Sequence, residues 1–261
     1  LGGAGTVVLD TLVWTGGVST WLLMGLPYYL FSALYAFFIA GRVRLEPGLT
    51  IPDHLRRAYG PASAVIGALL IFVLASPADE LLMLGTILSH ATGLPRLPAM
   101  ALCAAAVPLI LARGGLRSDV WTNALQMLLM YSGFALLVAA ALRAAPLAAT
   151  LASLPAAHLD LSGGLAPLKI LGWWLIASWT IVDPGFHQRC AAAESPQAAR
   201  RGILISIGFW AMFDLMTMLA GLTARALEPG LAQPALAFPA LAERVLGPWS
   251  KALFYAALCS S

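Results

Sequence analysis

The chain has 261 residues, of which 60% are hydrophobic and 10% are charged, and its formal net charge is +3. A soluble domain carries about 25% charged residues, so this composition excludes an ordinary soluble protein, and so small a net charge gives no sign of nucleic-acid binding. The apolar residues come in blocks of about 18 or more, the length that a helix needs to cross a bilayer, which predicts an all-α, multi-spanning membrane protein.

We predict about eight membrane spans from the apolar runs and from the Gly and Pro residues between them. The first is a partial helix that runs from Leu1 to about residue 15 and ends at a Gly-Gly pair. The other seven are expected at about residues 20–40, 62–91, 97–112, 118–142, 168–188, 199–227 and from 249 onward. Short helices outside the spans are expected at Ile51–Tyr59 and Ala240–Val245. Both ends of the sequence lie within helix-like runs, so we expect a fragment cut inside a helix at each end.

Several carboxylates lie inside or at the start of these apolar runs, where an ionised group costs at least about 2.5–3.5 kcal/mol. Those inside are Asp10, Asp79, Glu80, Asp183 and Asp214. Such residues usually face a water-filled path, a partner or a ligand, so they indicate transport. For Asp79 and Glu80, pairing with Arg or a polar group is the alternative, because adjacent helical residues point about 100° apart.

Asp119 is a further candidate for the transport path, and it lies in the first turn of a predicted helix. A carboxylate there is also favoured by the free N–H groups and by the helix dipole, so a capping role is the alternative.

Four segments resemble motifs of the solute:sodium symporter family, and they follow one another in the family's order. Residues 114–126 resemble its Gly-Gly-Leu … Trp-Thr-Asp … Gln signature, and residues 183–195 resemble its Gln-Arg … Ala-Ala-Lys-Ser segment. Residues 256–261 are similar to its small-residue run that ends in paired hydroxyls. Residues 2–5 look like the Gly-rich midpoint of its broken first core helix. Together these resemblances extend from one end of the sequence to the other.

The chain departs from the family's pattern at two positions. Asn123 stands where the family has Asp after Trp-Thr, and Glu194 stands where Lys is common. Asp119 lies one helical turn before Asn123 and shares its face, which leaves open whether it replaces the missing carboxylate.

The resemblance implies a leucine-transporter-like fold of two inverted five-helix repeats within a single transporter domain, residues 1–261. The first repeat would cover about residues 1–143, and part of the second would cover about residues 167–261. The family couples inward sodium flow to uptake of sugars, amino acids, carboxylates or vitamins. The expected function is therefore symport of a small polar solute with sodium across a bacterial plasma membrane, the inner membrane. No catalysis and no cofactor besides the coupling ion are expected.

Three other functions stay open on the sequence. Some proteins that resemble this family carry the transporter fold as the sensory input domain of a membrane histidine kinase. The extra carboxylates also leave proton coupling open in place of sodium coupling. An intramembrane enzyme is a third class, but no carboxylate pair has a catalytic spacing, and no zinc motif, nucleophile elbow or phosphate loop is found.

The cation site is predicted at Ala257, Ser260 and Ser261, on the run that resembles the family's paired hydroxyls. Sodium takes oxygen ligands, which the two hydroxyls and the Ala257 carbonyl would supply, and spacings of three and four residues place them on one helical face. The alternative is that the Ser hydroxyls bond their own backbone carbonyls.

The solute site is predicted at Trp179 and Asp183. The two residues are one α-helical turn apart and so share a face, which lines the central cavity in a family member. His187 is interpreted as a surface or interfacial residue, and His54, His90 and His158 receive no role.

Overall fold

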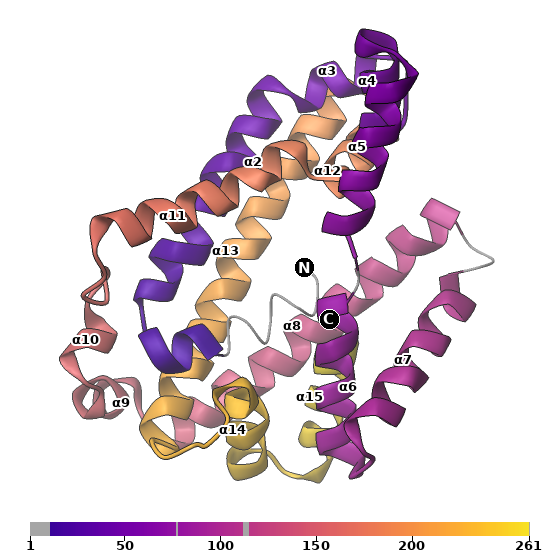
Figure 1. Cartoon of the computed structure of the whole chain (residues 1–261). Helices are drawn as coiled ribbons and strands as arrows, with labels where there is room; N and C mark the ends of the chain where they lie inside the picture. The colour runs from indigo at the N-terminus through magenta and orange to yellow at the C-terminus, as the bar shows by residue number, and fades with distance from the viewer. Residues whose placement is uncertain (1–10, 77, 112–114, 261) are drawn as a thin grey trace. The chain divides into compact units, whose positions relative to one another are not determined.

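The computed structural model describes residues 11–76, 78–111 and 115–260, which form helices and connecting turns without a strand (Figure 1). The chain divides into two compact units, each built from segments that are far apart in the sequence. One unit, which we call the α2 unit, comprises Trp21–Ser76 and Gly164–Met212. The other, the α8 unit, comprises Leu1–Thr20, Pro77–Gly163 and Phe213–Ser261.

The α2 unit begins with a wide turn that Pro27 explains. A π-helical turn, η1 (Trp21–Gly25), leads into α2 (Leu26–Phe38), which has Pro27 in its first turn. Proline has no N–H, and its ring clashes with the carbonyl four residues earlier, so the preceding turn widens. The indole Nε1 of Trp174 donates a hydrogen bond to the carbonyl of Leu22 at 3.1 Å, which supplies a donor where the proline removes one.

The α2 unit continues through α3 (Ala40–Leu45), α4 (Ile51–Tyr59) and α5 (Pro61–Leu74). The predicted short helix at Ile51–Tyr59 is confirmed with the same bounds. It begins at a capping box, in which the hydroxyl of Thr50 accepts from the N–H of Asp53 while the Asp53 carboxylate accepts from the N–H of Thr50. The box satisfies two donors that a helix start would leave unpaired, and α4 then packs against α5.

The second half of the α2 unit contains an interrupted helix and the start of a long one. The elements are α11 (Pro167–Ala177), the 3₁₀ turn η2 (Ser178–Val182), α12 (Pro184–Ala191) and α13 (Pro196–Leu227) up to Met212. Both α11 and η2 pack against α2, and α12 packs against α3 (Figure 1).

The α8 unit is built around its longest helix and a cluster of phenylalanine rings. Its helices are α6 (Ala78–Thr92), α7 (Arg96–Leu111), α8 (Gly115–Ala144), α9 (Leu147–Ser153), α10 (Ala156–Leu159), the rest of α13, η3 (Pro234–Leu236), α14 (Ala237–Val245) and α15 (Pro248–Ser260). Phe134 of α8 is fully buried among Phe213, Phe238 and Phe254, with ring centroids 5.0, 5.2 and 5.5 Å away. These tilted rings hold α8 against α13, α14 and α15.

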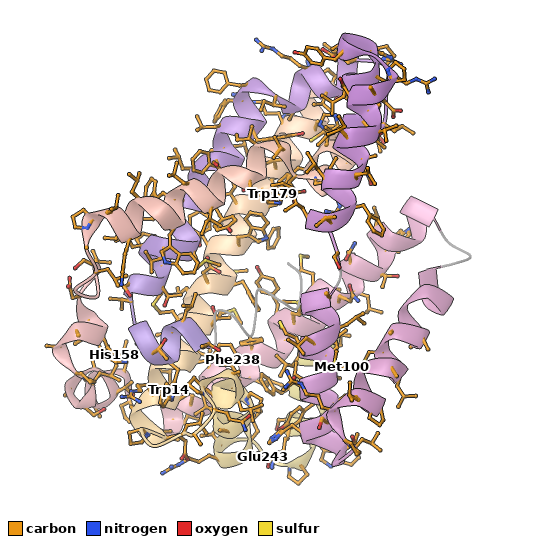
Figure 2. All side chains as sticks on the ribbon, viewed as in Figure 1. Trp14, Met100, His158, Trp179, Phe238 and Glu243 are labelled. Atoms are coloured by element: carbon orange, nitrogen blue, oxygen red, sulfur yellow. The ribbon has the colours of Figure 1, made fainter. Side chains whose placement is uncertain are left out.

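The predicted end of the first span at a Gly-Gly pair is confirmed. Gly17 has φ +65°, and a Cβ there would lie 2.2 Å from the carbonyl oxygen of His158. The backbone of α10 reaches this turn, where the N–H of Val18 donates to His158 at 2.9 Å, and Nε2 of His158 lies 3.2 Å from the carbonyl of Trp14 (Figure 2). His158, which received no role above, is therefore a buried residue that fixes the end of the first span.

Three helices of the described residues are long and apolar enough to cross a membrane. They are Trp21–Phe38, Val120–Ala144 and Pro196–Leu227, and shorter apolar helices cover Pro61–Leu74, Leu81–Thr92 and Arg96–Ala106. The predicted number of eight membrane spans is therefore not confirmed. The single helix expected over about residues 62–91 is wrong, because α5 ends at Leu74 and α6 begins at Ala78, on either side of Pro77. A proline disfavours helical backbone at the residue before it, so the sequence around Pro77 favours an end of α5 before Ser76.

Candidate functional site

The interrupted helix of the α2 unit changes direction at Asp183. The backbone of Asp183 is extended, with φ −64° and ψ 121°, between the 3₁₀ turn η2 and the start of α12. Pro184 follows and disfavours helical backbone at the residue before it, so the sequence Asp-Pro produces the break locally. The carboxylate of Asp183 then caps α12, because its Oδ1 accepts from the N–H of Phe186 at 2.8 Å. The span expected over about residues 168–188 is therefore not one continuous helix, because it is interrupted at Asp183.

Trp179 and Asp183 do not share a face in the way that the sequence analysis assumed. Trp179 lies in η2, a half-buried position in a helix with about three residues per turn rather than 3.6 (Figure 2). In that form Thr180, which is only 3% exposed, is the residue one turn before Asp183. The two predicted solute residues still lie at the same break, but the argument from a spacing of four residues is wrong.

Two buried hydroxyls of α2 have no hydrogen-bond partner among the described residues. Ser32 and Tyr35 are one turn apart and 0% exposed, and both their hydroxyl oxygens are unpaired. The ring of Tyr35 lies 5.6 Å from the ring of Phe186, the residue whose N–H is capped by Asp183. A buried hydroxyl without a partner costs about 1–3 kcal/mol, so each of the two hydroxyls calls for an explanation, such as a bound solute or an ordered water molecule.

Sequence reasoning missed both of these residues. The only signal was a Ser and a Tyr three residues apart within an apolar run. The surroundings of Ser32 and Tyr35 depend on how α2 packs against the η2 turn. These two segments are far apart in the sequence, so the sequence alone does not show that they meet.

The predicted cation site lies at the end of α15, in the α8 unit. Ala257 is 0% exposed and packs against α8 where that helix has Gly133, so the two backbones come close together. The backbone of Ser260 completes α15. The Ser260 side chain and the whole of Ser261 lie outside the described residues, so the hydroxyl cluster stays a prediction.

Most predicted transport-path carboxylates also lie outside what the structure describes. Asp10 lies before the described residues. Asp79 and Glu80 are in the first turn of α6, and Asp119 is near the start of α8, but their side chains are not described. Asp214 is described, and it is half-buried in α13 beside Phe213 of the aromatic core.

The candidate residues fall into different units. Trp179 and Asp183 belong to the α2 unit, whereas Ala257 and Asp214 belong to the α8 unit. The structure therefore groups the solute candidates with Ser32 and Tyr35 in one unit, and the described cation candidate belongs to the other unit.

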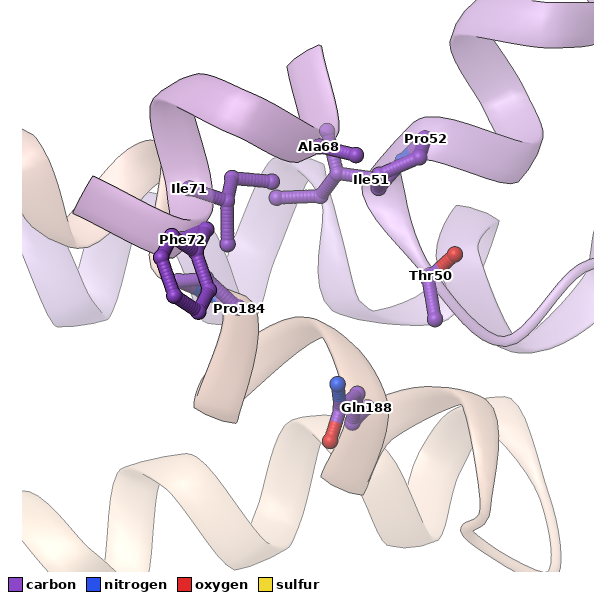
Figure 3. Close-up of a pocket in the computed structure, with 8 residues that line it drawn as sticks. All are labelled: Thr50, Ile51, Pro52, Ala68, Ile71, Phe72, Pro184 and Gln188. Atoms are coloured by element: carbon purple, nitrogen blue, oxygen red, sulfur yellow. The ribbon is translucent and has the colours of Figure 1, made fainter. Parts of the chain in front are cut away.

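The α2 unit also has an open pocket of about 290 Å³, lined by the start of α4, one face of α5 and residues Pro184 and Gln188 of α12 (Figure 3). Its lining is mainly apolar, and neither Trp179 nor Asp183 contributes to it. Within the described residues, no group of three or more His, Cys, Asp or Glu side chains is placed to hold a metal ion.

The whole sequence matches a known protein family. The model of the Sodium:solute symporter family matches residues 1–261. No curated protein matches the chain. The family match thus includes every candidate residue above, both inside and outside the described part of the structure.

Proposed function

The chain belongs to the sodium:solute symporter family, and on that premise we propose that it carries a small polar solute into a bacterial cell together with sodium. Members of the family are transporters rather than enzymes, so the chain is a membrane protein of sodium-coupled solute transport. The proposed arrangement is multi-pass in the inner membrane. Two inverted repeats, at about residues 1–143 and 167–261, would form one transporter domain.

The proposal for the solute site rests on one observation: the helix break at Asp183 packs against α2, where the buried hydroxyls of Ser32 and Tyr35 have no partner among the described residues. A broken helix inside a membrane is tolerated where its polar backbone lines a cavity, and transporters place their solute sites at such breaks. We infer that the solute accepts or donates hydrogen bonds at Ser32, Tyr35 and Asp183. Trp179 would stack on the solute and exclude water.

The proposed cation site is formed by Ala257, Ser260 and Ser261. A sodium ion prefers oxygen ligands, and the match to the family's paired hydroxyls supports this position. The carboxylates Asp10, Asp79, Glu80, Asp119 and Asp214 are the proposed charged groups of the transport path, where an ionised side chain in a membrane needs water or a partner.

The solute site is tested by uptake into proteoliposomes that contain the full-length protein and have an inward sodium gradient. A panel of radiolabelled sugars, amino acids and carboxylates first identifies the solute. Trp179→Ala should then raise the KM for that solute about tenfold, because lost stacking of about 1.4 kcal/mol corresponds to a factor of ten. Trp249→Ala, at a residue that is 90% exposed, is the matched control and should leave KM unchanged. An unchanged KM in Trp179→Ala would remove Trp179 from the site.

Tyr35→Phe separates a solute ligand from a structural residue, because it removes only the hydroxyl. An unpaired buried hydroxyl destabilises the protein without solute, so Tyr35→Phe should be as stable as the native protein or more stable. The same variant should raise the KM for the solute. A variant that loses stability while its KM stays native would show that the Tyr35 hydroxyl has a structural partner instead.

A further inference from the structure

Two histidines that are far apart in the sequence meet within the α2 unit. His54 lies in α4 and His187 lies in α12, and their ring centroids are 4.8 Å apart with an interplanar angle of 73°. Nδ1 of His54 lies 3.2 Å from Oε2 of Glu46, the residue that follows α3. Three separate elements therefore bring two imidazoles and one carboxylate together.

The Nε2 atoms of both rings have no hydrogen-bond partner in the part of the chain that the structure describes. Nε2 of His54 and Nε2 of His187 are each buried, and neither forms a hydrogen bond with any described residue. In the neutral tautomer that has its proton on Nδ1, facing Glu46, Nε2 of His54 carries a lone pair without a donor. A buried polar nitrogen without a partner is unfavourable, so this pair of nitrogens needs an explanation.

Both rings are held on the rigid starts of capped helices. His54 is four residues after its N-cap Thr50 and His187 is four residues after its N-cap Asp183, and each backbone N–H donates to the carbonyl of that cap residue, at 3.4 and 3.1 Å. Each cap side chain in turn accepts from a backbone N–H of the first helical turn. The two imidazoles are thus positioned by backbone geometry rather than by flexible loops.

We propose that His54 and His187 bind a divalent first-row transition-metal ion, Zn²⁺ in the first instance, through their Nε2 atoms. Imidazole nitrogen is a favoured ligand of Zn²⁺, whereas the proposed sodium site has only oxygen ligands. A metal-binding histidine commonly donates its other N–H to a carboxylate, which orients the ring and makes it a better ligand. Glu46 stands in that relation to His54, and water would complete the tetrahedral shell.

The number of protein ligands sets the character of the site. Two histidines are fewer than the three or four protein ligands of a resident zinc site. The site is therefore one of reversible binding. A bound ion would join α4 to α12, the half-helix that Asp183 caps.

The test is isothermal titration of the purified full-length protein with ZnCl₂, after chelator treatment and with an affinity tag that contains no histidine. One Zn²⁺ per protein should bind. His54→Gln and His187→Gln should each weaken binding at least tenfold, and Glu46→Gln should weaken it about tenfold, as is usual for loss of a supporting carboxylate. His90→Gln, at an exposed histidine of α6, should bind like the native protein. MgCl₂ should not compete.

Gel filtration checks that each variant is folded. Glu46→Gln should fold like the native protein, because the Glu46 side chain is 63% exposed and lies between helices, so its weaker binding reports the loss of the carboxylate. A second measurement uses CoCl₂, whose visible absorption reports nitrogen ligands; the band should be present in the native protein and lost in both histidine variants. The proposal is overturned if no saturable binding of one ion occurs, or if His54→Gln and His187→Gln bind Zn²⁺ with native affinity.

Discussion

Replacing Gly133 with alanine tests the close approach of α8 and α15. A Cβ at Gly133 would lie 2.6 Å from the Cβ of Ala257 and 3.4 Å from the Cα of Phe254. The first distance is about 1 Å shorter than normal contact between carbon atoms. Ala257 and Phe254 are both 0% exposed, so neither side chain can move away, and α15 itself must shift.

The magnitude follows from two opposing terms. Overpacking of a well-packed core costs typically about 1–3 kcal/mol. Replacing glycine with alanine inside a helix gains up to about 1 kcal/mol. Gly208→Ala in α13 supplies a matched control, because a Cβ there meets nothing within 4 Å and only the second term applies. Gly133→Ala should therefore be less stable than Gly208→Ala by about 1–3 kcal/mol.

The assay compares the two variants by thermal and denaturant unfolding of the full-length protein in detergent. Because Ala257 belongs to the proposed cation site, Gly133→Ala should also raise the sodium concentration for half-maximal uptake, and Gly208→Ala should not. Equal stability of the two variants would refute the packing of α8 on α15 described above.

Three further predictions concern individual hydrogen bonds. Thr50→Ala removes the capping box of α4 and should lower the free energy of unfolding by about 1 kcal/mol, and native stability would contradict the cap. Trp174→Phe leaves the carbonyl of Leu22 without its indole donor and should destabilise the protein by about 1–3 kcal/mol, whereas an unchanged midpoint would mean that water replaces the bond. The hydrogen bond from Lys251 holds the pKa of Glu243 below its ordinary value of 4.5, so its stabilisation is complete above pH 4.5 and is lost as the pH falls through the folded-state pKa. Glu243→Gln should therefore show a flatter loss of stability below pH 4.5, and superimposable pH profiles would exclude this contribution.

Punctuating residues made much of the local structure predictable. The break at Asp183 was predictable because Pro184 constrains the residue before it, and the turn after the first helix was predictable because Gly17 accepts left-handed backbone. Pro27 and Pro77 were also visible in the sequence. Whether a proline widens a turn, as before α2, or separates two helices, as between α5 and α6, depends on the donors and packing that surround it.

The candidate site was less predictable, because its residues meet through packing between distant segments. Ser32 and Tyr35 become part of the candidate site only because η2 packs against α2. His54 meets His187 only because α3 and α4 lie close to α12. Trp179 shows a second limit, since a spacing rule for α-helices does not hold in a 3₁₀ turn. The family motifs supplied what periodicity could not, and the match of the family model to residues 1–261 confirmed the family that they indicated.

The most direct test of sodium coupling through α15 is equilibrium binding of ²²Na⁺ to the purified full-length protein, measured by scintillation proximity. This measurement needs no knowledge of the solute. The native protein should bind ²²Na⁺ that NaCl displaces and KCl does not, and Ser260→Ala/Ser261→Ala should raise the half-displacing concentration at least tenfold, as expected if lost ligands are worth about 1.4 kcal/mol. Native affinity in the double variant, or no saturable sodium binding in the native protein, would contradict the account.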